Sequence, residues 1–479
     1  MQDDAAGPKM TEAPAAPQPY PLDERALRAV AGTALSNPFF DGAALFALRH
    51  WFFPVSRLWA AAREAHGDPQ RFYDAVPMPP RFEDRGRLTK ALAAFEQARA
   101  AANAIEAEWD RVFFGPKDVN ESERQAVEAA RRSLRHAYNA TRRHFRFLVN
   151  RQVPRVKLAI ATPAEVEAVY AAALGDGVRD GIVAFTAAPD PAPDVEVSRA
   201  IISPTGRDFW LRFKSPSARL GDMVYARVHE PAGVANPPTI IFGHGICVEF
   251  DHWRGLIDEC HALARLGFRV IRPEAPWHGR RNRPGQFGGE NIIASFPLGT
   301  LDTLFGAVQE WAVLAAWARA TSKGPMAFGG SSLGAMTSQF AADRAADWPA
   351  PLRPDALLLL THTGDLSDVV LKGALAELWM SPADVKAKGW TEDTARDYLS
   401  LLQPARPLSL PASRIVSVLG RRDAVLPFES GRQLVESWCV PEHNCFVFDR
   451  GHFSVPMTLV RNDAPLKRFA EVMAAIQSA

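Results

Sequence analysis

Residues 325–338 read Pro-Met-Ala-Phe-Gly-Gly-Ser-Ser-Leu-Gly-Ala-Met-Thr-Ser, and this stretch decides the fold of the chain. The apolar run Met326–Phe328 is typical of a strand end, and Ala335–Asp347 is typical of a helix. Between them, Gly330–Gly334 has the form Gly-x-Ser-x-Gly with Ser332 at its centre. A serine on a sharp strand-to-helix turn exposes its hydroxyl at the positive end of the helix. We therefore predict that Ser332 is a nucleophile.

The same pentapeptide also occurs by chance in long chains, where it marks only a glycine-rich turn with an incidental serine. In a true nucleophile turn, a β-carbon at either flanking glycine would collide with the neighbouring strand or helix. Ser331 would then occupy the unreactive position beside Ser332. The other members of a catalytic set must decide between these two interpretations.

Two further residues complete such a set. His452 directly follows the last predicted strand, and Asp423 directly follows the strand before it. An aspartate in that place can accept a hydrogen bond from the imidazole and hold the tautomer that takes a proton from serine. Asp423 could instead cap a helix or pair with Arg421 or Arg422. The chain order Ser332, Asp423, His452 favours the catalytic interpretation, because serine hydrolases of the α/β type share it.

The oxyanion that forms during acyl transfer needs backbone N–H donors. We expect one from Leu333, directly after the nucleophile, and a second from Ile246 in the loop after the third predicted strand. That loop, residues 243–247, reads Gly-His-Gly-Ile-Cys. His244 does not fit the chain order of a general base, so we interpret it as structural in that respect. Cys247 is interpreted as a packing residue.

A second loop, residues 273–283, follows the fourth predicted strand and faces the same edge of the sheet. It carries three arginines, and guanidinium groups bind carboxylates and phosphates well. The alternative is that these arginines hold Glu274 and Glu290 in place. The candidate substrate contacts are His244, Trp277, Arg280 and Arg281.

The chain divides into regions that differ in composition and in predicted secondary structure. Residues 1–22 are rich in Ala, Pro and acidic residues and lack a basic start followed by an apolar core, so we predict a disordered tail and not a signal peptide. Residues 23–187 have a helical pattern, with one long helix each over 87–113 and 120–149. A Pro/Asp-rich linker separates them from residues 195–479, where strand and helix patterns alternate.

The second long helix of the N-terminal region carries a basic face. Such a face can meet RNA or an anionic lipid, but it is more often a solvated surface or a patch against acidic side chains. Strong salt-dependent binding by this region would support the nucleic-acid or membrane role. The basic residues are Arg132, Arg135, Arg142, Arg143 and Arg146.

The alternating region predicts an α/β fold, because strands separated by helix-length segments form a largely parallel sheet covered on both faces. Residues 361–410 form a helical insertion after the sixth predicted strand and carry two exposed-looking tryptophans, Trp379 and Trp390. In an α/β sheet this insertion would stand over the carboxyl ends of the strands, where ligands bind. The predicted strands are 195–202, 223–228, 239–242, 268–272, 325–328, 356–360, 414–419 and 444–448.

Composition excludes several classes of protein. Of the 479 residues, 47% are apolar and 23% are charged, and the formal net charge of +1 implies no polyanionic partner. The four cysteines form no Cys-x-x-Cys pair, so we expect free thiols and neither a zinc site nor a redox motif. Aromatic residues crowd positions 39–62, but charges and a proline interrupt them, which argues against a membrane span; we favour a buried helix pair over an interfacial anchor. A cytoplasmic location is the default expectation.

Taken together, these motifs resemble the α/β-hydrolase superfamily over residues 195–478. The set comprises the His-Gly loop, the Gly-x-Ser-x-Gly turn, Gly-x-x-Asp before a helix and Gly-His after the last strand. The Pro-Trp-His-Gly-Arg-Arg stretch, residues 276–281, is similar to the Pro-x-x-Gly turn after the fourth strand of that superfamily. The tract from Trp253 to the nucleophile turn resembles the abhydrolase domain-containing 18 group, which implies a leaning towards lipid-like esters. Helical additions in such hydrolases often form part of a substrate-covering wall, which implies a role in specificity for the N-terminal region.

The sequence therefore predicts a serine hydrolase that cleaves carboxylic esters or thioesters through an acyl-enzyme, with a small-molecule acyl substrate and neither metal nor organic cofactor. Two alternatives stay open. One is amide or peptide hydrolysis by the same three residues, and the other is a binding protein on a hydrolase fold, because fold alone does not imply activity.

Overall fold

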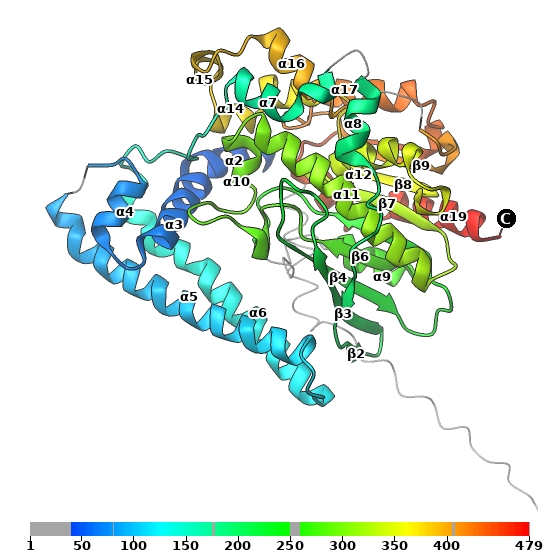
Figure 1. Ribbon diagram of the computed structural model, residues 1–479, viewed down its shortest axis with the longest axis horizontal. Coiled ribbons are helices and arrows are strands. Elements are labelled where there is room, and N and C mark those ends of the chain that lie inside the picture. Colours follow the sequence, from blue (N-terminus) through cyan, green and yellow to red (C-terminus); the bar gives the residue numbers. More distant parts are fainter. Residues whose placement is uncertain (1–39, 80, 175–177, 250–258, 405–407, 479) are drawn as a thin grey trace, which may run out of the picture.

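The structure is a computed structural model that describes residues 40–79, 81–174, 178–249, 259–404 and 408–478. The predicted tail over residues 1–22 lies outside these ranges, as does the first half of a further helix that the sequence predicts over residues 252–266. The chain forms a sheet-centred unit flanked by a long helical arm, with a helical layer above the sheet (Figure 1).

The described strands form one ten-stranded sheet with the order β1-β3-β4-β6-β5-β7-β8-β9-β10, and β2 pairs with β3. Strands β5 to β10 run parallel, whereas β1 to β4 join the sheet in antiparallel pairs. This sheet, with helices on both faces, is the α/β-hydrolase fold that the sequence predicts. The strands are β1 (Glu196–Val197), β2 (Ile201–Ser203), β3 (Gly206–Lys214), β4 (Met223–Pro231), β5 (Thr239–Gly243), β6 (Arg269–Pro273), β7 (Met326–Ser331), β8 (Ala356–Leu360), β9 (Ile415–Gly420) and β10 (Cys445–Phe448).

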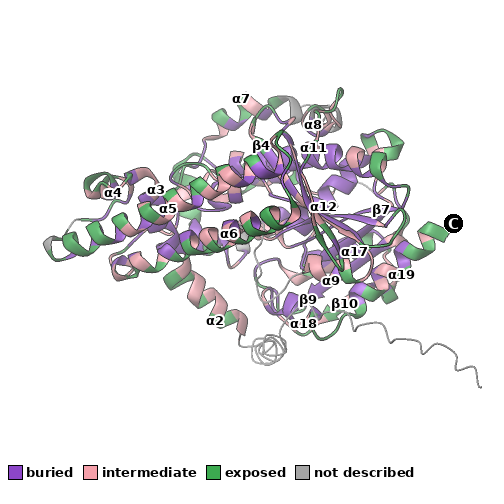
Figure 2. Ribbon diagram, turned by 90° about the horizontal axis from the view of Figure 1, so that it is seen from below, coloured by how far each residue is buried: buried purple, intermediate pink, exposed green. Residues whose placement is uncertain are grey.

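Burial on both faces explains the composition of the inner strands. Strands β5, β7, β8 and β9 are buried at every residue, so their sequences show apolar or small residues without alternation. One face packs on α11 (Leu298–Thr321) and α12 (Leu333–Arg344), and the other on α9 (Glu259–Arg265) and α19 (Ala464–Ser478). Figure 2 shows this buried interior in purple around β7 and α12.

The sequence analysis missed β3, which pairs with β1, β2 and β4. Its buried and exposed positions alternate only in part, and Arg207, Asp208, Arg212 and Lys214 interrupt the apolar residues. The single strand predicted over 195–202 is two short strands, because both halves pair separately with β3.

The N-terminal region is helical, as predicted. Its longest elements, α5 (Arg85–Phe113) and α6 (Glu121–Ala140), pack against each other and form the long arm seen at the lower left of Figure 1. The single helix predicted over 120–149 is wrong in its second half, where the α-helix ends at Ala140 and a 3-10 segment, η3 (Thr141–Leu148), continues. Phe145 and Leu148, three residues apart, lie on one face of this 3-10 segment and are buried, as is Thr141.

The aromatic segment 39–62 forms α2 (Phe40–Ala47), the π-helix η1 (Leu48–Phe52) and the start of α3 (Phe53–Ala65). Helix α3 is buried along most of its length, in agreement with the buried interpretation. Phe46 of α2 and Trp51 of η1 are nevertheless exposed, so the prediction of burial is wrong for these two side chains. Across the described parts of the chain, no helix combines the length and apolar character that a membrane crossing requires.

The insertion over residues 361–410 is helical, and it packs on α7 (Pro163–Leu174) of the N-terminal region. Both tryptophans of the insertion are buried, with Trp379 7% and Trp390 3% exposed, so their predicted exposure is wrong. The indole N–H of Trp390 donates to the carbonyl of Ala161 at 2.6 Å, which satisfies its polar atom inside the packing. The helices of the insertion are α13 (Leu366–Lys372), α14 (Ala376–Trp379), α15 (Pro382–Ala387) and α16 (Glu392–Ser400).

All four cysteines are free; the burial expected for Cys439 and Cys445 is not observed, because Cys439 is exposed and Cys445 is half-buried. The remaining α-helices complete the covering of the sheet and the arm. They are α4 (Pro69–Ala75), α8 (Val178–Thr186), α10 (Glu290–Ala294), α17 (Phe428–Ser437) and α18 (Ser454–Leu459). The 3-10 segments are η2 (Phe82–Asp84), η4 (Gly279–Arg281), η5 (Ala345–Asp347), η6 (Ala350–Leu352), η7 (Ala412–Arg414) and η8 (Glu442–Asn444).

Candidate active site

Ser332 occupies the turn between β7 and α12. Its φ of 56° and ψ of −118° form an uncommon conformation for a residue with a side chain. Strand β7 ends at Ser331 and the helix begins at Leu333, so a single residue makes the whole change of direction. The conformation places the hydroxyl at the first turn of α12, where the positive end of the helix favours a developing anion.

Two glycines make this sharp turn possible. A β-carbon on Gly334 would lie 2.0 Å from the carbonyl oxygen of Gly243, and one on Gly330 would lie 2.3 Å from the carbonyl carbon of Gly334. Both distances are far shorter than any tolerated contact, so the strands and the helix approach closely only because both residues lack a side chain. The steric argument made from the sequence therefore holds at these two positions.

A chain of hydrogen bonds joins Ser332, His452 and Asp423. The Nε2 atom of His452 lies 3.0 Å from Ser332 Oγ, and its Nδ1 lies 2.8 Å from Asp423 Oδ2. His452 and Asp423 are each 7% exposed, which shields both hydrogen bonds from water. With Nδ1–H donated to the carboxylate, Nε2 is the acceptor for the serine hydroxyl proton. The three residues come from three separate strand ends, as the sequence analysis expected.

Asp423 is held by the turn in which it lies. Its Oδ1 atom accepts hydrogen bonds from the N–H groups of Val425 at 2.9 Å and Leu426 at 2.8 Å, which leaves Oδ2 for His452. The alternative salt bridge to the neighbouring arginine is absent among the described contacts, because Arg422 pairs with Asp449 at 2.7 Å. The carboxylate is therefore fixed in position by two backbone donors before it meets the imidazole.

The loop after β5 passes directly beside Ser332. A β-carbon on Gly245 would lie 3.7 Å from Ser332 Cβ, so the backbone of this loop approaches the nucleophile at contact distance. The next residue, Ile246, lines the same pocket as Ser332 and Leu333. Leu333 is the first residue of α12, and the first N–H groups of a helix have no intrahelical acceptor. Both residues expected to donate to an oxyanion are thus near the serine.

Two buried histidines hold this loop against the loop after β6. His244 Nδ1 lies 2.7 Å from the carbonyl of Gly245, and its Nε2 accepts from the N–H of Ala275 at 3.1 Å. His278 lies 2.9 Å through Nδ1 from the carbonyl of Pro276, and its Nε2 accepts from the N–H of Cys247 at 3.3 Å. In each ring one nitrogen donates and the other accepts, which defines the neutral imidazole.

Burial also favours the neutral form of both histidine rings. It lowers the pKa of His278 to about 4 and the pKa of His244 well below its ordinary value. Burial also raises the pKa of the Cys247 thiol, so that side chain is an unreactive packing group, in line with its interpretation from the sequence. His244 is therefore a structural residue of the loop.

The two arginines proposed as substrate contacts are occupied by carboxylates. Arg281 binds Glu310 at 2.6 Å and Asp222 at 2.8 Å. Burial alone would lower the pKa of Arg281, but these two carboxylates outweigh it and raise that pKa. Arg280 binds Glu274 and Glu106, each at 2.6 Å. The arginine side chains therefore brace the loop after β6.

These contacts favour the alternative reading of the loop. Arg280 holds Glu274 in place, whereas Glu290 pairs with Arg57 of α3 at 3.3 Å. Trp277 is 4% exposed and lies under the guanidinium of Arg283, 4.6 Å from its ring centroid. None of the four candidate substrate contacts is among the described residues that line the pocket at Ser332. For Arg280 and Arg281, the physical reason is that carboxylates on neighbouring elements bind both cations.

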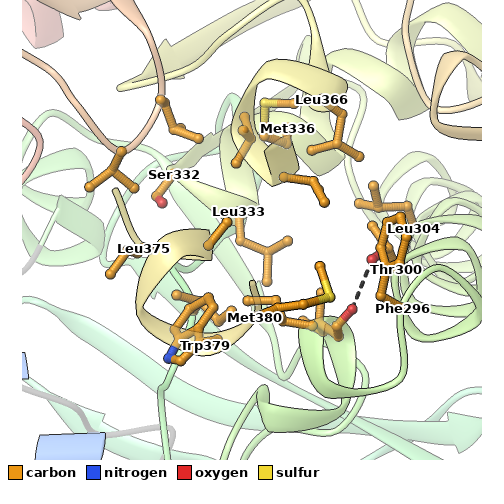
Figure 3. A pocket seen from close by; sticks show the side chains of 18 residues that line it. Phe296, Thr300, Leu304, Ser332, Leu333, Met336, Leu366, Leu375, Trp379 and Met380 are labelled. Carbon is orange, nitrogen blue, oxygen red and sulfur yellow. Dashed lines mark hydrogen bonds between the residues drawn. The ribbon is translucent and has the colours of Figure 1, made fainter. Parts of the chain in front are cut away.

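An apolar pocket of about 90 Å³ opens at Ser332 (Figure 3). Apart from Ser332, its polar groups are the hydroxyl of Thr300, which donates to the carbonyl of Ile292 at 2.8 Å, and the buried indole N–H of Trp379, which has no hydrogen-bond partner among the described residues. The wall consists of Ile246, Ile292, Ile293, Phe296, Leu304, Leu333, Met336, Leu366, Val369, Val370, Leu375, Ala376, Trp379, Met380, Val425 and Leu426.

Sequence reasoning placed the insertion over the strand ends but did not identify its side chains as the pocket wall. Helices α13 and α14 supply one side of the pocket, and α10 and α11 supply another. The N-terminal region supports this wall from outside, since Phe53 contacts Trp379 edge-on with ring centroids 4.9 Å apart. The apolar residues of the insertion, among them Leu366, Val369 and Leu375, were the signal in the sequence that pointed to this burial.

Asp41, in the first turn of α2, also acts on the site, and the sequence did not reveal this role. Its Oδ1 atom accepts from the N–H of Phe453 at 2.7 Å, and its Oδ2 accepts from the hydroxyl of Ser454. These two residues directly follow His452. Asp41 thus fixes the loop that carries the imidazole, although 411 residues separate Asp41 from His452 in the chain. No local motif marks such a contact.

Comparison with known proteins yields structural neighbours only. No family model and no curated protein matches this chain, so the resemblance to the abhydrolase domain-containing 18 group is not shown. Acetyl xylan esterase 1 from Thermoanaerobacterium sp. JW/SL YS485 is 17% identical, with 58% of this chain and 88% of that chain covered and a TM-score of 0.41. Acetyl xylan esterase from Paenibacillus sp. R4 is 18% identical, with coverages of 61% and 92% and a TM-score of 0.40.

An S-formylglutathione hydrolase from Agrobacterium tumefaciens is 15% identical, with 58% of this chain and 99% of that chain covered and a TM-score of 0.38. The matched part corresponds in extent to the sheet-centred unit rather than to the whole chain. Similarity at this level identifies neither an activity nor a substrate for this protein.

Proposed function

We propose that this protein hydrolyses carboxylic esters or thioesters with an apolar acyl group through an acyl-enzyme at Ser332. The observation that carries the proposal is the hydrogen-bonded chain Ser332–His452–Asp423 at the mouth of an apolar pocket. A buried nucleophile–base–carboxylate chain is what acyl transfer requires, and an apolar wall suits the hydrocarbon part of an acyl group.

In the first half of the reaction, Ser332 Oγ attacks the acyl carbonyl carbon and its proton passes to His452 Nε2. Asp423 stabilises the imidazolium through the bond to Nδ1. The negative charge on the former carbonyl oxygen is stabilised by the N–H groups of Leu333 and Ile246. Collapse of the tetrahedral intermediate breaks the bond to the alcohol or thiol, which takes the proton from His452.

In the second half, a water molecule gives a proton to His452 and adds to the acyl carbon. Collapse releases the carboxylic acid, and Ser332 Oγ regains the proton. Oxidation states do not change, and the net reaction consumes one ester and one water. The steps use only the three side chains and the two backbone donors named above.

The test uses a fluorophosphonate probe and a series of p-nitrophenyl esters. The folded wild-type protein should be labelled at Ser332, and Ser332→Ala should lose both labelling and ester turnover. Ser331→Ala is the matched control, because it removes the neighbouring hydroxyl and leaves the proposed nucleophile. Ester hydrolysis at Ser332 is refuted if wild-type protein is unlabelled, or if Ser332→Ala keeps full activity.

The ester series also tests the acyl preference. Because the pocket is lined by hydrocarbon, kcat/KM should rise from acetate to longer acyl chains, with each buried methylene contributing about 0.8 kcal/mol. A matched p-nitroanilide series separates ester from amide hydrolysis at the same residues. Faster turnover of the anilides would replace the proposal by amide hydrolysis.

A further inference from the structure

A second, polar cavity lies between the helical arm and the sheet-centred unit. It has a volume of about 430 Å³ and shares no described lining residue with the apolar pocket at Ser332. Helices α3, α5 and α6 form one side, and residues of the loop after β6, among them Gly279, Asn282 and Pro284, form the other. Each of the three helices presents an arginine to it: Arg63, Arg99 and Arg135.

The three arginines differ in how far their charge is satisfied. Arg99 pairs with Glu96 and donates to the carbonyl of Arg63 at 3.1 Å. Arg63 donates to the carbonyl of Gln286 at 2.8 Å, and no described carboxylate pairs with it. The buried Nε of Arg135 has no hydrogen-bond partner in the structure, and no described carboxylate pairs with this residue either. Arg63 and Arg135 therefore carry positive charge that the protein leaves uncompensated.

The two acidic residues of the cavity do not supply the missing charge. Glu64 lies 3.7 Å from the ammonium group of Lys157. Glu249 pairs with Arg142 at 2.6 Å, and it also accepts from the N–H of Gly288 and the side chain of Asn282. Each lining glutamate is thus matched by a cation outside the lining, so the positive charge of the arginines remains.

The ring of Tyr138 lies among these cations. Burial raises its pKa, while the charges of Arg63, Arg135 and Arg99 act to lower it. The guanidinium of Arg135 lies 5.9 Å from the centroid of this ring. Neutral amide groups of Asn103 and Asn139 also line the cavity and can donate hydrogen bonds. Cations, a phenol and amides from separate helices together surround one space.

We propose that this cavity binds a small organic anion bearing a phosphate or carboxylate group, held chiefly by Arg63 and Arg135. Guanidinium groups match the planar, bidentate geometry of such anions better than any other side chain. An anion would also supply the acceptor that the buried Nε of Arg135 lacks. Of the five basic residues noted in the sequence, Arg135 is the one that lines this cavity.

The position of Glu249 gives the site a connection to the active-site loop. Glu249 is three residues after Ile246 on the segment that passes Ser332. It lines the anion cavity while its carboxylate is bonded to Arg142 of the helical arm. The anion site therefore adjoins the loop from which an oxyanion donor is expected.

The experiment measures anion binding by isothermal titration calorimetry on the full-length Ser332→Ala protein, so that ester chemistry contributes nothing. The probes are inorganic phosphate, pyrophosphate and citrate, with glucose as the uncharged control. Arg135→Gln and Arg63→Gln remove one guanidinium each. Arg143→Gln is the matched control, because Arg143 is an exposed arginine of the same basic segment that does not line the cavity.

At least one of the three anions should bind saturably, glucose should not, and added NaCl should weaken the binding. Each cavity variant should weaken the affinity about tenfold, which corresponds to about 1.4 kcal/mol. Preference for pyrophosphate identifies a phosphate ligand, and preference for citrate identifies a carboxylate ligand. Circular dichroism verifies that each variant is folded, and Arg135→Lys replaces Arg135→Gln if the latter is not.

Two results overturn the proposal. One is the absence of saturable binding of all three anions to the folded protein. The other is equal affinity in the two cavity variants and Arg143→Gln. Neither result bears on ester hydrolysis, because the binding is measured without the proposed nucleophile.

Discussion

Replacing Asp41 by alanine should impair ester turnover although Asp41 lies outside the pocket. The carboxylate of Asp41 binds the N–H of Phe453 and the hydroxyl of Ser454, directly after His452. Asp41→Ala removes both acceptors and leaves the loop with a free backbone donor. We expect the loop to sample arrangements in which His452 Nε2 no longer lies 3.0 Å from Ser332 Oγ.

The magnitude follows from the two hydrogen bonds. A hydrogen bond to a charged group contributes about 1.5–3 kcal/mol. Asp41 is only partly buried, so water replaces part of each bond after substitution. We therefore expect a net loss of about 1.5–3 kcal/mol in the positioning of the loop. If this loss appears in transition-state stabilisation, kcat/KM falls about 10- to 100-fold.

The assay is kcat/KM for p-nitrophenyl butyrate, together with fluorophosphonate labelling rate and thermal unfolding. Asp41→Asn should recover most of the activity, because the amide oxygen still accepts from Phe453 and the amide N–H can donate to Ser454. Phe46→Ala is the control on the same helix, since Phe46 is 54% exposed and should change turnover little. Retention of wild-type kcat/KM in Asp41→Ala would refute the reasoning, as would an equal loss in Phe46→Ala.

Three further outcomes are expected. Ala376→Leu adds carbon atoms to the wall of the apolar pocket. The value of kcat/KM for long acyl esters should therefore fall about tenfold, while turnover of the acetate ester changes little. An equal loss of kcat/KM for all chain lengths in the ester series would contradict this prediction. Arg281→Met leaves Glu310 buried without its cation. The free energy of unfolding, measured in urea, should therefore fall by about 3–5 kcal/mol, and a fall of less than about 1 kcal/mol would contradict this prediction. Acidification should destabilise the fold through His278. Because its folded pKa of about 4 lies below the unfolded 6.5, its stability contribution, about 3 kcal/mol, is complete above pH 6.5 and lost as the pH falls towards 4. The slope of stability against pH should be shallower in His278→Gln, and an identical slope would count against the neutral buried imidazole.

Local patterns in the sequence were sufficient to predict the elements that are buried on every face. Strand β8 has the predicted bounds 356–360, because it is a continuous apolar run with a polar residue directly before and after it. The segment β3 was missed because its charged residues alternate incompletely with apolar ones. The end of α6 was missed because apolar residues continue past it at Phe145 and Leu148, without a glycine or proline to mark the change from α-helix to 3-10 helix.

The candidate site divides in the same way. Ser332, Asp423 and His452 each follow a strand, and the carboxyl ends of parallel strands meet at one edge, so their proximity was predictable from chain order. The roles suggested for Arg280 and Arg281 were not predictable, because the partners Glu106, Asp222 and Glu310 come from distant elements. The sequence alone does not show whether an arginine is paired with a carboxylate in the folded protein.

The sequence by itself determined the α/β fold, the sharp turn at Ser332 and the order of the three residues that meet there. These depend on local spacing, on the absence of a side chain at Gly330 and Gly334, and on the direction of parallel strands. Tertiary structure alone decided which side chains line the pocket, how Asp41 reaches the loop of His452, and which arginines remain without a carboxylate. Those features arise from contacts between residues far apart in the chain, and neither periodicity nor composition encodes the three-dimensional distance between them.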